Sequence, residues 1–287
     1  MTWLWPYTTL SDARWVKGNL HLHTDESDGE LSVGEAITRY ADMGYRFIAI
    51  TDHDLVNDHE VAAKRHDLMV IPGYESSVHE HLLCIGSDSV CLGEHSDVVA
   101  HTVGAGGLVI VSHPNWISDE YWPVERIQQL AGVCGIEIYN THIAHLEGSP
   151  FAVREWDELL SNGVRVWGFA SDDTHRRSDA GKAWISVWTA ASDRRGLMEA
   201  LSRGSFYASN GPVLTRIAFD ASRHEVTISG TSLATFEMIG AEGARLRTCE
   251  NKHSATFALQ DDQAYIRFEC HTAKGTAWTQ PMINTAM

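Results

Sequence analysis

Histidines and carboxylates with metal-ligand spacing are concentrated in the first 175 residues. His21 and His23 flank one residue, so on an extended chain both imidazoles point to the same side and can reach one ion. Further candidate groups follow short apolar runs: Asp28, His53, Glu75, His81, His113, Asp173 and His175. Imidazole and carboxylate without thiolate suit Zn²⁺, Mn²⁺ or Fe²⁺. Because so many ligands exceed the needs of one ion, the sequence predicts two or three divalent metal ions as the cofactor.

Each of these residues also has a structural interpretation when it is taken alone. A single histidine at a strand end is more often a hydrogen-bonded core or surface residue than a ligand. An aspartate or glutamate there is more often a turn former or a solvated side chain. The repetition favours a functional cluster, because each case places a costly polar group beside an apolar run.

The elements that must position these groups alternate between strands and helices. The apolar runs predict strands at 19–21, 47–51, 69–71, 82–85, 108–112, 135–139 and 166–170. Helices are predicted at 33–43, with Ser32 as the N-cap, and at 150–160. This alternation is typical of an α/β fold with a mostly parallel sheet or barrel. In such a barrel the functional groups gather at the C-terminal ends of the strands.

The remainder of the chain has a different pattern and few histidines. Thirteen of the 16 histidines lie between His21 and His175. Short runs at 214–219, 225–228, 235–239, 244–247, 255–259 and 265–270, separated by polar or glycine-containing turns, predict an antiparallel β domain. The predicted organisation is therefore a barrel over residues 1–212, which holds the candidate ligands, and a small β domain over residues 213–287.

Composition limits the classes of partner and compartment. The formal net charge of -16 argues against a nucleic-acid-binding surface, and no apolar stretch is long enough to span a membrane. Five cysteines without CxxC spacing argue against a disulfide scaffold and favour a cytoplasmic location. The expected partner is a small-molecule substrate.

Several strings in the first part resemble the motifs of the PHP (polymerase and histidinol phosphatase) family. Gly18-Asn-Leu-His-Leu-His-Thr24 and Ile50-Thr-Asp-His-Asp54 look like its first two motifs. Pro72-Gly-Tyr-Glu75, His81-Leu-Leu83, Ser112-His-Pro114, Glu137-Ile-Tyr-Asn140 and Ser171-Asp-Asp-Thr-His175 resemble the later ones in order. Residues 181–184, 201–212 and 277–281 are similar to the subgroup with a C-terminal β domain, the metallohydrolases related to carbaryl hydrolase.

The resemblance implies a distorted (β/α)₇ TIM-like barrel and a di- or trinuclear metal site. By position, the implied ligands are His21, His23, Asp28, His53, Glu75, His81, His113, Asp173 and His175. Glu75 would bridge two ions. His79 competes with His81 for one ligand role, and His81 is preferred because the run after it matches the motif.

The expected activity is hydrolysis of a small phosphorylated metabolite by attack of a metal-bound hydroxide. Asp173 or His142 is expected to move protons to the leaving group. Arg176, Arg177 and Lys182 follow the last ligands and are candidates to hold a phosphate, although a solvated basic cluster is an equal alternative. Asn140 and Asn210 are candidates to orient substrate or water, and Arg176 is also a candidate catalytic residue.

Two alternatives remain open at this point. The same metal cluster can cleave a carboxylic or carbamic ester or an amide, because the ligands do not distinguish these reactions. The chain can also be a non-catalytic metal-binding interaction module. A structural metal site, however, is usually closed and needs few ligands, and this set is larger.

Overall fold

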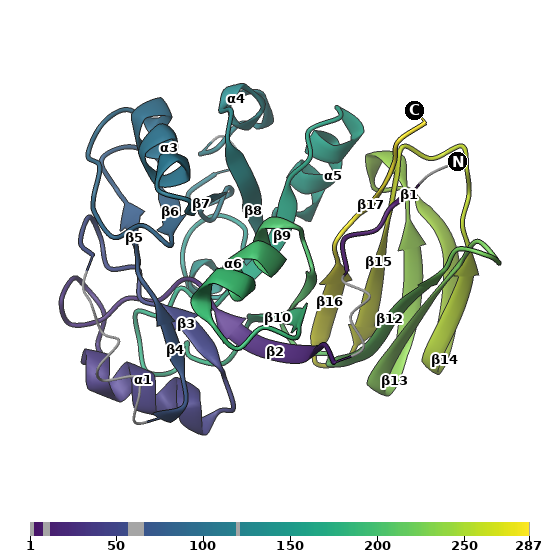
Figure 1. Cartoon of the computed structure of the whole chain (residues 1–287), viewed down its shortest axis with the longest axis horizontal. Coiled ribbons are helices and arrows are strands. Elements are labelled where there is room, and N and C mark those ends of the chain that lie inside the picture. The colour runs from purple at the N-terminus through teal and green to yellow at the C-terminus, as the bar shows by residue number, and fades with distance from the viewer. Residues whose placement is uncertain (1–2, 8–11, 57–65, 119–120, 287) are drawn as a thin grey trace.

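Two β-sheets form the framework of the chain. The computed structural model describes residues 3–7, 12–56, 66–118 and 121–286 (Figure 1). One sheet has five strands, in the order β5 (Gly73–Ser76), β6 (Leu82–Ile85), β7 (Leu108–Val111), β8 (Val133–Asn140) and β9 (Trp167–Ser171). The larger sheet contains β4 (Met69–Ile71), β3 (Phe47–Ala49), β2 (Arg14–Asn19), β10 (Trp184–Thr189) and β11 (Phe206–Ser209), and continues into the C-terminal strands. The chain thus has a mixed α/β fold.

The helices lie around these strands. They are α1 (Val33–Asp42), α3 (His95–Gly104), α4 (Val124–Gln129), α5 (Val153–Ser161) and α6 (Arg194–Ser202), with the 3₁₀ turns η2 (His142–His145) and η3 (Ala241–Gly243). The predicted helix at 33–43 is confirmed, because Ser32 and Glu35 form a capping box that starts α1. None of the helices in the described ranges has the length and apolar character of a transmembrane segment.

The predicted helix at 150–160 begins later than expected. Residues just before α5 are held against β8, where Asn140 N donates to Pro150 O and Ala152 N donates to Ile138 O. These bonds keep the segment extended, so the helix begins only at Val153.

The expectation of a mostly parallel arrangement is only partly correct. β2–β3, β3–β4, β7–β8 and β8–β9 are parallel pairs. In contrast, β5–β6, β6–β7 and β2–β10 are antiparallel. β5 and β6 follow each other without a helix between them, so the chain reverses there and this pair is antiparallel.

The C-terminal strands form the predicted antiparallel β structure. They are β12 (Leu214–Asp220), β13 (Glu225–Ile239), β14 (Arg245–Ala258), β15 (Tyr265–Thr272), β16 (Gly275–Thr279) and β17 (Met282–Asn284). Two of them, β13 and β14, are longer than the strands predicted for the same residues. The predicted separate strands at 225–228 and 235–239 are wrong, since β13 runs through both. Register shifts between Ser229 and Ala234 absorb the polar residues that suggested a turn.

The C-terminal strands are continuous with the rest of the molecule. β16 pairs with β11, and β1 (Trp3–Leu4) pairs with β17, so the two ends of the chain lie side by side at the right of Figure 1. In the same view α5 lies between the helix-bearing part and the C-terminal strands. Asp157 on α5 binds the buried Arg267 on β15 through both carboxylate oxygens, at 2.7 Å each.

Candidate metal centre

Backbone hydrogen bonds beyond the ends of the strands bring the candidate ligands together. His23 N donates to Thr174 O at 2.9 Å, and Asp173 N donates to His21 O at 3.0 Å. Thr51 N donates to Leu22 O at 2.9 Å. A parallel bridge then joins His53 to Glu75. The segments after β2, β3 and β9 therefore lie beside β5, and their side chains share one site.

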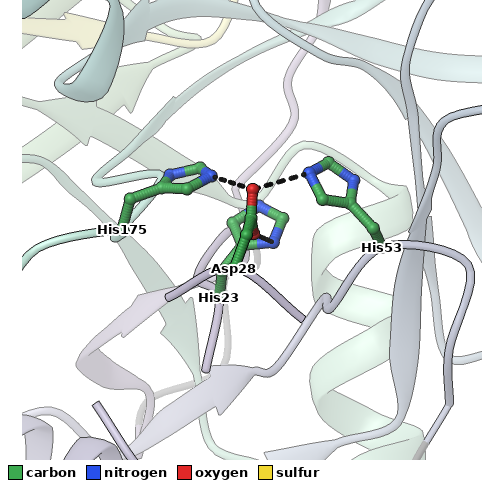
Figure 2. Close-up of side chains that lie close together, drawn as sticks. All are labelled: His23, Asp28, His53 and His175. Atoms are coloured by element: carbon green, nitrogen blue, oxygen red, sulfur yellow. Dashed lines mark ion pairs between the residues drawn. The ribbon is translucent and has the colours of Figure 1, made fainter. Parts of the chain in front are cut away.

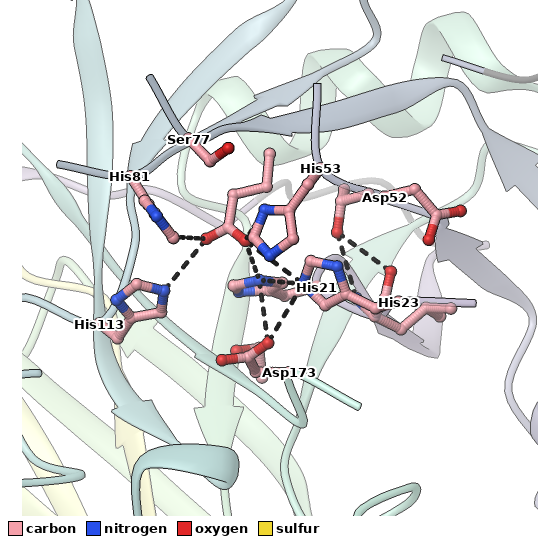
Figure 3. Close-up of polar contacts among 12 residues, drawn as sticks. His21, His23, Asp52, His53, Ser77, His81, His113 and Asp173 are labelled. Atoms are coloured by element: carbon pink, nitrogen blue, oxygen red, sulfur yellow. Dashed lines mark hydrogen bonds and ion pairs between the residues drawn. The ribbon is translucent and has the colours of Figure 1, made fainter. Parts of the chain in front are cut away.

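Glu75 lies at the middle of this site and faces imidazoles with both carboxylate oxygens. Its Oε1 is 3.0 Å from His113 Nε2 and 3.2 Å from His81 Nδ1. Its Oε2 is 3.3 Å from a ring nitrogen of each of His21, His23 and His53. Figure 3 shows the rings of these histidines gathered in one site. A carboxylate with two separate sets of neighbours has the geometry of a bridging ligand.

Asp28 and Asp173 provide the other carboxylates of the cluster. Asp28 Oδ2 is 3.3 Å from His175 Nε2 and 3.5 Å from His53 Nε2, as Figure 2 shows. Asp173 Oδ1 is 3.1 Å from His21 Nε2 and 3.3 Å from ring nitrogens of His23 and His175. These two carboxylates extend the site from Glu75 toward His175.

The ligating atoms form four overlapping groups, in each of which the atoms lie within 4.8 Å of one another. The groups are His23, Asp28, His53 and His175; His21, His113 and Asp173; His21, His23 and Glu75; and His53, Glu75 and His81. All nine residues proposed as ligands from the sequence occur in at least one group. His79, the competitor of His81, instead lies 3.5 Å from Glu94.

Unsatisfied polar atoms show that this donor set fits metal ions. Nδ1 of His23, His53, His81 and His113 and Oδ1 of Asp173 are buried without a well-oriented hydrogen bond, although charged atoms lie close to several of them. Buried polar groups are normally hydrogen-bonded. Short N···O distances without hydrogen-bond alignment are expected where each atom is directed at a common cation.

The carboxylates and imidazoles of the candidate ligands shift one another's pKa values. Burial alone would lower the pKa of His23, but the adjacent carboxylates of Asp173 and Glu75 outweigh burial and raise it to about 9. Burial would raise the pKa of Glu75, but the imidazoles of His21 and His81 hold it well below its usual range. Without metal the cluster therefore keeps ionised carboxylates and binds protons on imidazoles.

A second layer of side chains orients these ligands, and the sequence did not assign it. Glu137 on β8 accepts from His21 Nδ1 at 2.9 Å, from His113 N at 2.8 Å and from Ser171 Oγ. Asp52 accepts from the Thr24 backbone and hydroxyl at 2.7 Å. Carboxylates that fix metal-binding histidines in this way tune ring orientation and basicity. A signal was present for Glu137, because an ionisable residue interrupts the apolar run of β8.

Backbone strain also accompanies the site. His113 has φ of 29° and Asp173 has φ of 50°, in the left-handed region that residues other than glycine rarely adopt. Such conformations persist only where the surrounding structure enforces them, and they are frequent at ligand sites.

Three of the residues predicted to act on the substrate, His142, Arg176 and Asn140, lie next to the candidate ligands in the structure or in the sequence. The His142 ring stacks on His175 with centroids 4.1 Å apart, and its Nδ1 is 3.6 Å from Asp179 Oδ2. Arg176 is exposed next to His175 in the chain. Asn140 Nδ2 donates to Glu137 and Asp173, so this amide belongs to the support of the ligands.

The other three candidates for substrate binding, Arg177, Asn210 and Lys182, form their hydrogen bonds and ion pairs with residues outside the candidate ligands. The Arg177 guanidinium pairs with Glu35 at 2.8 Å. Asn210 Oδ1 accepts from Thr276 N at 2.7 Å, among the C-terminal strands. Lys182 contributes its backbone N–H to Asp172 at 2.8 Å. Among the described residues, no hydrogen bond or ion pair given above joins these three side chains to the candidate ligands.

Comparisons with known proteins identify a family over the part of the chain that holds most of the candidate ligands. The sequence model of the PHP domain family matches residues 19–159, which hold seven of the nine candidate ligands. No curated protein sequence matches the chain.

Among solved structures, a two-domain protein from Bacteroides vulgatus, containing a predicted PHP-like metal-dependent phosphoesterase, is 18% identical with a TM-score of 0.58. The likeness covers 96% of this chain and 97% of that one, so the two share a fold over both parts. An amidohydrolase from Chromobacterium violaceum is 18% identical with a TM-score of 0.47, over 65% of this chain and 96% of that one. The metal-binding motifs, their convergence and the family match lead to one conclusion: this chain contains a PHP domain.

Proposed function

We propose that this protein is a metal-dependent hydrolase that cleaves phosphoesters of a small phosphorylated metabolite. The observation that carries the proposal is Glu75, whose two oxygens face separate sets of histidines. This arrangement supports two or three divalent ions held side by side. Zn²⁺, Mn²⁺ and Fe²⁺ all suit its imidazole and carboxylate donors.

The proposed ligand sets follow the overlapping groups. Asp28, His53, His175 and His23 would hold one ion, and Glu75 would connect it to ions held by the remaining ligands. When bound, such ions neutralise the charge of a phosphoryl group and lower the pKa of water. The chain's own contribution is to fix the ligands through Glu137 and to exclude bulk water from the buried His21, His23 and Glu75.

Two residues at the His175 end are proposed to act on the substrate. Arg176 is exposed beside the cluster, and a guanidinium is well suited to bind phosphate oxygens. His142, between His175 and Asp179, is proposed to donate a proton to the leaving oxygen. It suits this role better than Asp173, because Asp173 faces three histidines with Oδ1 and accepts from Asn140 with Oδ2.

The strands around the site support the proposal of a distorted (β/α)₇ barrel. The five-stranded sheet ends at β9, and backbone bonds connect the segment after β9 to those after β2 and β3, and then to β5. We propose that the hydrolase unit spans residues 1–212 and the β domain residues 213–287. All five cysteines are free, which agrees with a proposed cytoplasmic location.

Metal analysis followed by a substrate screen tests the proposed reaction. The purified protein is loaded with Mn²⁺, Zn²⁺ or Fe²⁺ and given phosphomonoesters, cyclic phosphates, phosphodiesters, carboxylic esters, carbamates and amides. Phosphate release, lost by more than about 100-fold in His53→Ala and Glu75→Ala, is expected, because even supporting residues of a metal site change activity by 10–100-fold. His253→Ala, an exposed histidine on β14, is the matched control.

Other results of the substrate screen would favour one of the two alternative functions. Turnover of carboxylic or carbamic esters or amides alone would assign the same cluster to that chemistry. Metal binding without turnover of any substrate class would indicate a non-catalytic interaction module.

A further inference from the structure

A second group of side chains with metal-binding chemistry lies on the C-terminal strands, outside the candidate metal centre. Glu237 on β13 is the direct cross-strand partner of Glu269 on β15, and His271 is two residues further along β15. Because alternate residues of a strand share one face, the three side chains project from the same side of the sheet. A ligand atom from each lies within 4.8 Å of the other two.

The distances among these side chains suit the ligands of a single ion. His271 Nε2 is 3.0 Å from Glu269 Oε2 and 3.5 Å from Glu237 Oε2, and the second distance is longer than a normal hydrogen bond. Two ligand atoms that each lie about 2.1 Å from a shared ion, in tetrahedral or octahedral coordination, are about 3.0–3.4 Å apart. The three side chains therefore need little movement to share an ion.

His271 is oriented by a hydroxyl group on the neighbouring strand. Its Nδ1 lies 3.0 Å from Thr276 Oγ1, and the two residues are cross-strand partners on β15 and β16. A histidine that binds metal through one ring nitrogen is usually hydrogen-bonded through the other. Since the strand pairing fixes this contact, Nε2 is held toward the carboxylates by a rigid element.

Glu269 is held from one side and presents one oxygen to the histidine. The buried Arg267 donates to Glu269 Oε1 and to both oxygens of Asp157. Oε2 of Glu269 faces His271 instead. The ion pair with Arg267 therefore fixes the carboxylate and leaves Oε2 in the position of a ligand.

Glu237 is covered by a second arginine that can give way to an ion. Arg245 Nε lies 2.9 Å from Glu237 Oε2, but the arginine side chain is 65% exposed, and ion pairs of exposed groups contribute little. In the network as a whole, three carboxylates face two guanidinium groups. One negative charge therefore remains when His271 is neutral, and a cation can balance it.

An ion can reach these side chains through a groove between α5 and the C-terminal strands. The groove has two hollows of about 700 and 680 Å³. Glu269 borders both, while His271 borders the first and Glu237 the second. The His271 side chain is about one-third exposed, whereas both carboxylates are largely buried. The group is thus accessible to an ion, as a metal site requires, without being a fully solvated surface cluster.

We propose that Glu237, Glu269 and His271 bind one divalent transition-metal ion at a site separate from the candidate metal centre. One imidazole and two carboxylates suit Zn²⁺ or Mn²⁺. Three protein ligands leave a further coordination position for water, as in metal sites that are open to solvent. The ion would link β13 to β15. This proposal does not depend on the proposed hydrolase function, since none of the three residues belongs to that site.

The number of Zn²⁺ ions bound per chain tests the site. The full-length metal-free protein is dialysed against Zn²⁺ to saturation, and bound zinc is counted by plasma mass spectrometry. His271→Ala and Glu237→Ala are each expected to bind one ion fewer than the unaltered protein, with unchanged circular dichroism spectra. His253→Ala, an exposed histidine on β14, is the matched control and should bind the full number.

A substitution behind the histidine tests the geometry of the site without removing a ligand. Thr276→Val removes the hydroxyl that orients His271, so the affinity of this site for Zn²⁺ should fall by about 10- to 100-fold. The number of ions bound at saturation should stay the same. Competition with a chromogenic chelator measures the affinity, and an unchanged affinity would contradict the orientation assigned to the ring.

Two results of the zinc count would overturn the proposal. Equal zinc content in the unaltered protein, His271→Ala and Glu237→Ala would leave the three side chains as a network of ion pairs only. Loss of one ion from His253→Ala as well would assign the binding to exposed histidines in general. His53→Ala should lose zinc from the candidate metal centre and keep this ion, so failure of one site is distinguishable from failure of the other.

Discussion

Glu137 contacts two candidate metal ligands, His21 and His113, without being a candidate ligand itself. Its Oε1 accepts from His21 Nδ1, and its Oε2 accepts from the backbone of His113, so one carboxylate fixes two ligands. Because it is buried, no water can replace these bonds. Its contribution is therefore to the orientation of the imidazoles.

Substitution of Glu137 is predicted to weaken metal binding without removing a ligand. Glu137→Gln keeps the shape of the side chain but loses its charge, so metal affinity should fall by about 10- to 100-fold. Competition with a chromogenic chelator measures the change. Glu125→Gln, the same substitution at an exposed position of α4, should bind metal as the unaltered protein does. An unchanged affinity in Glu137→Gln would remove the supporting role.

The raised pKa of His23 predicts that metal binding releases protons. The folded-state pKa is about 9, so the metal-free protein binds a proton there at pH 7, and a metal ion must displace it. Metal affinity should therefore fall as pH falls below about 9, by roughly tenfold per pH unit for each proton displaced. Calorimetry at pH 7 in buffers of different ionisation enthalpy counts the protons. Proton release as large at pH 10 as at pH 7 would contradict the assignment.

At the scale of elements, α5 is tied to the C-terminal strands by a buried ion pair. Asp157 binds Arg267 with both oxygens and also accepts from Tyr265 Oη at 2.8 Å. Arg267 also lies 2.5 Å from Glu269. Since Arg267 is almost fully buried, its charge depends on these two carboxylates. The network therefore fixes the position of α5 against β15.

Loss of one carboxylate from this network is predicted to destabilise the whole chain. Asp157→Ala leaves Arg267 with Glu269 alone, and removal of one partner of a buried pair costs about 3–5 kcal/mol. Urea unfolding measures the loss. Glu158→Ala, at the next and exposed position of α5, should change the free energy of unfolding by less than about 0.5 kcal/mol. Equal effects of the two substitutions would show that the pair does not hold the helix.

At the scale of the molecule, the candidate metal site connects segments that are distant in sequence. Its ligands come from positions between His21 and His175, on segments that follow several different strands. Buried ligand atoms such as Nδ1 of His113 and Oδ1 of Asp173 lack a well-oriented hydrogen bond when no cation is present, and this opposes folding. Bound ions should therefore stabilise the fold as well as supply chemistry.

Removal of metal is predicted to lower the Tm of the whole protein. A ligand that binds only the folded state stabilises it by about 2.7 kcal/mol at 100 times its Kd. For a chain of this size that corresponds to a shift of several degrees. Thermal unfolding with and without a chelator measures the shift. The same chelator should have little effect on Glu75→Ala, and an equal shift there would place the stabilising ions elsewhere.

Much of the site was predictable because its residues carry their chemistry in type and spacing. Local sequence signals include the pair at His21 and His23, Glu75 after Pro72-Gly73, and Asp173-Thr-His175. The structure brings all nine candidate ligands into overlapping groups. The cap of α1 was equally local, since Ser32 and Glu35 form it within one turn.

Other features depend on contacts between distant residues. The length of β13 follows from its partners β14 and β15, and the late start of α5 follows from bonds to β8. Neither partner is visible in the local pattern, so the sequence predicted breaks at the wrong places. The positions of Arg177 and Asn210, bound to Glu35 and Thr276, are likewise set by neighbours brought there by the fold.

The sequence by itself determined the family, the donor set and the chemistry available to it, because motif spacing and side-chain type are properties of the chain. Only the tertiary structure decided that Glu75 faces histidines with both oxygens, that Glu137 supports them, and that His271 faces two carboxylates on the C-terminal strands. The physical reason is that these are relations between side chains on different strands and loops. Such relations exist only once long-range backbone pairing has fixed the segments in space.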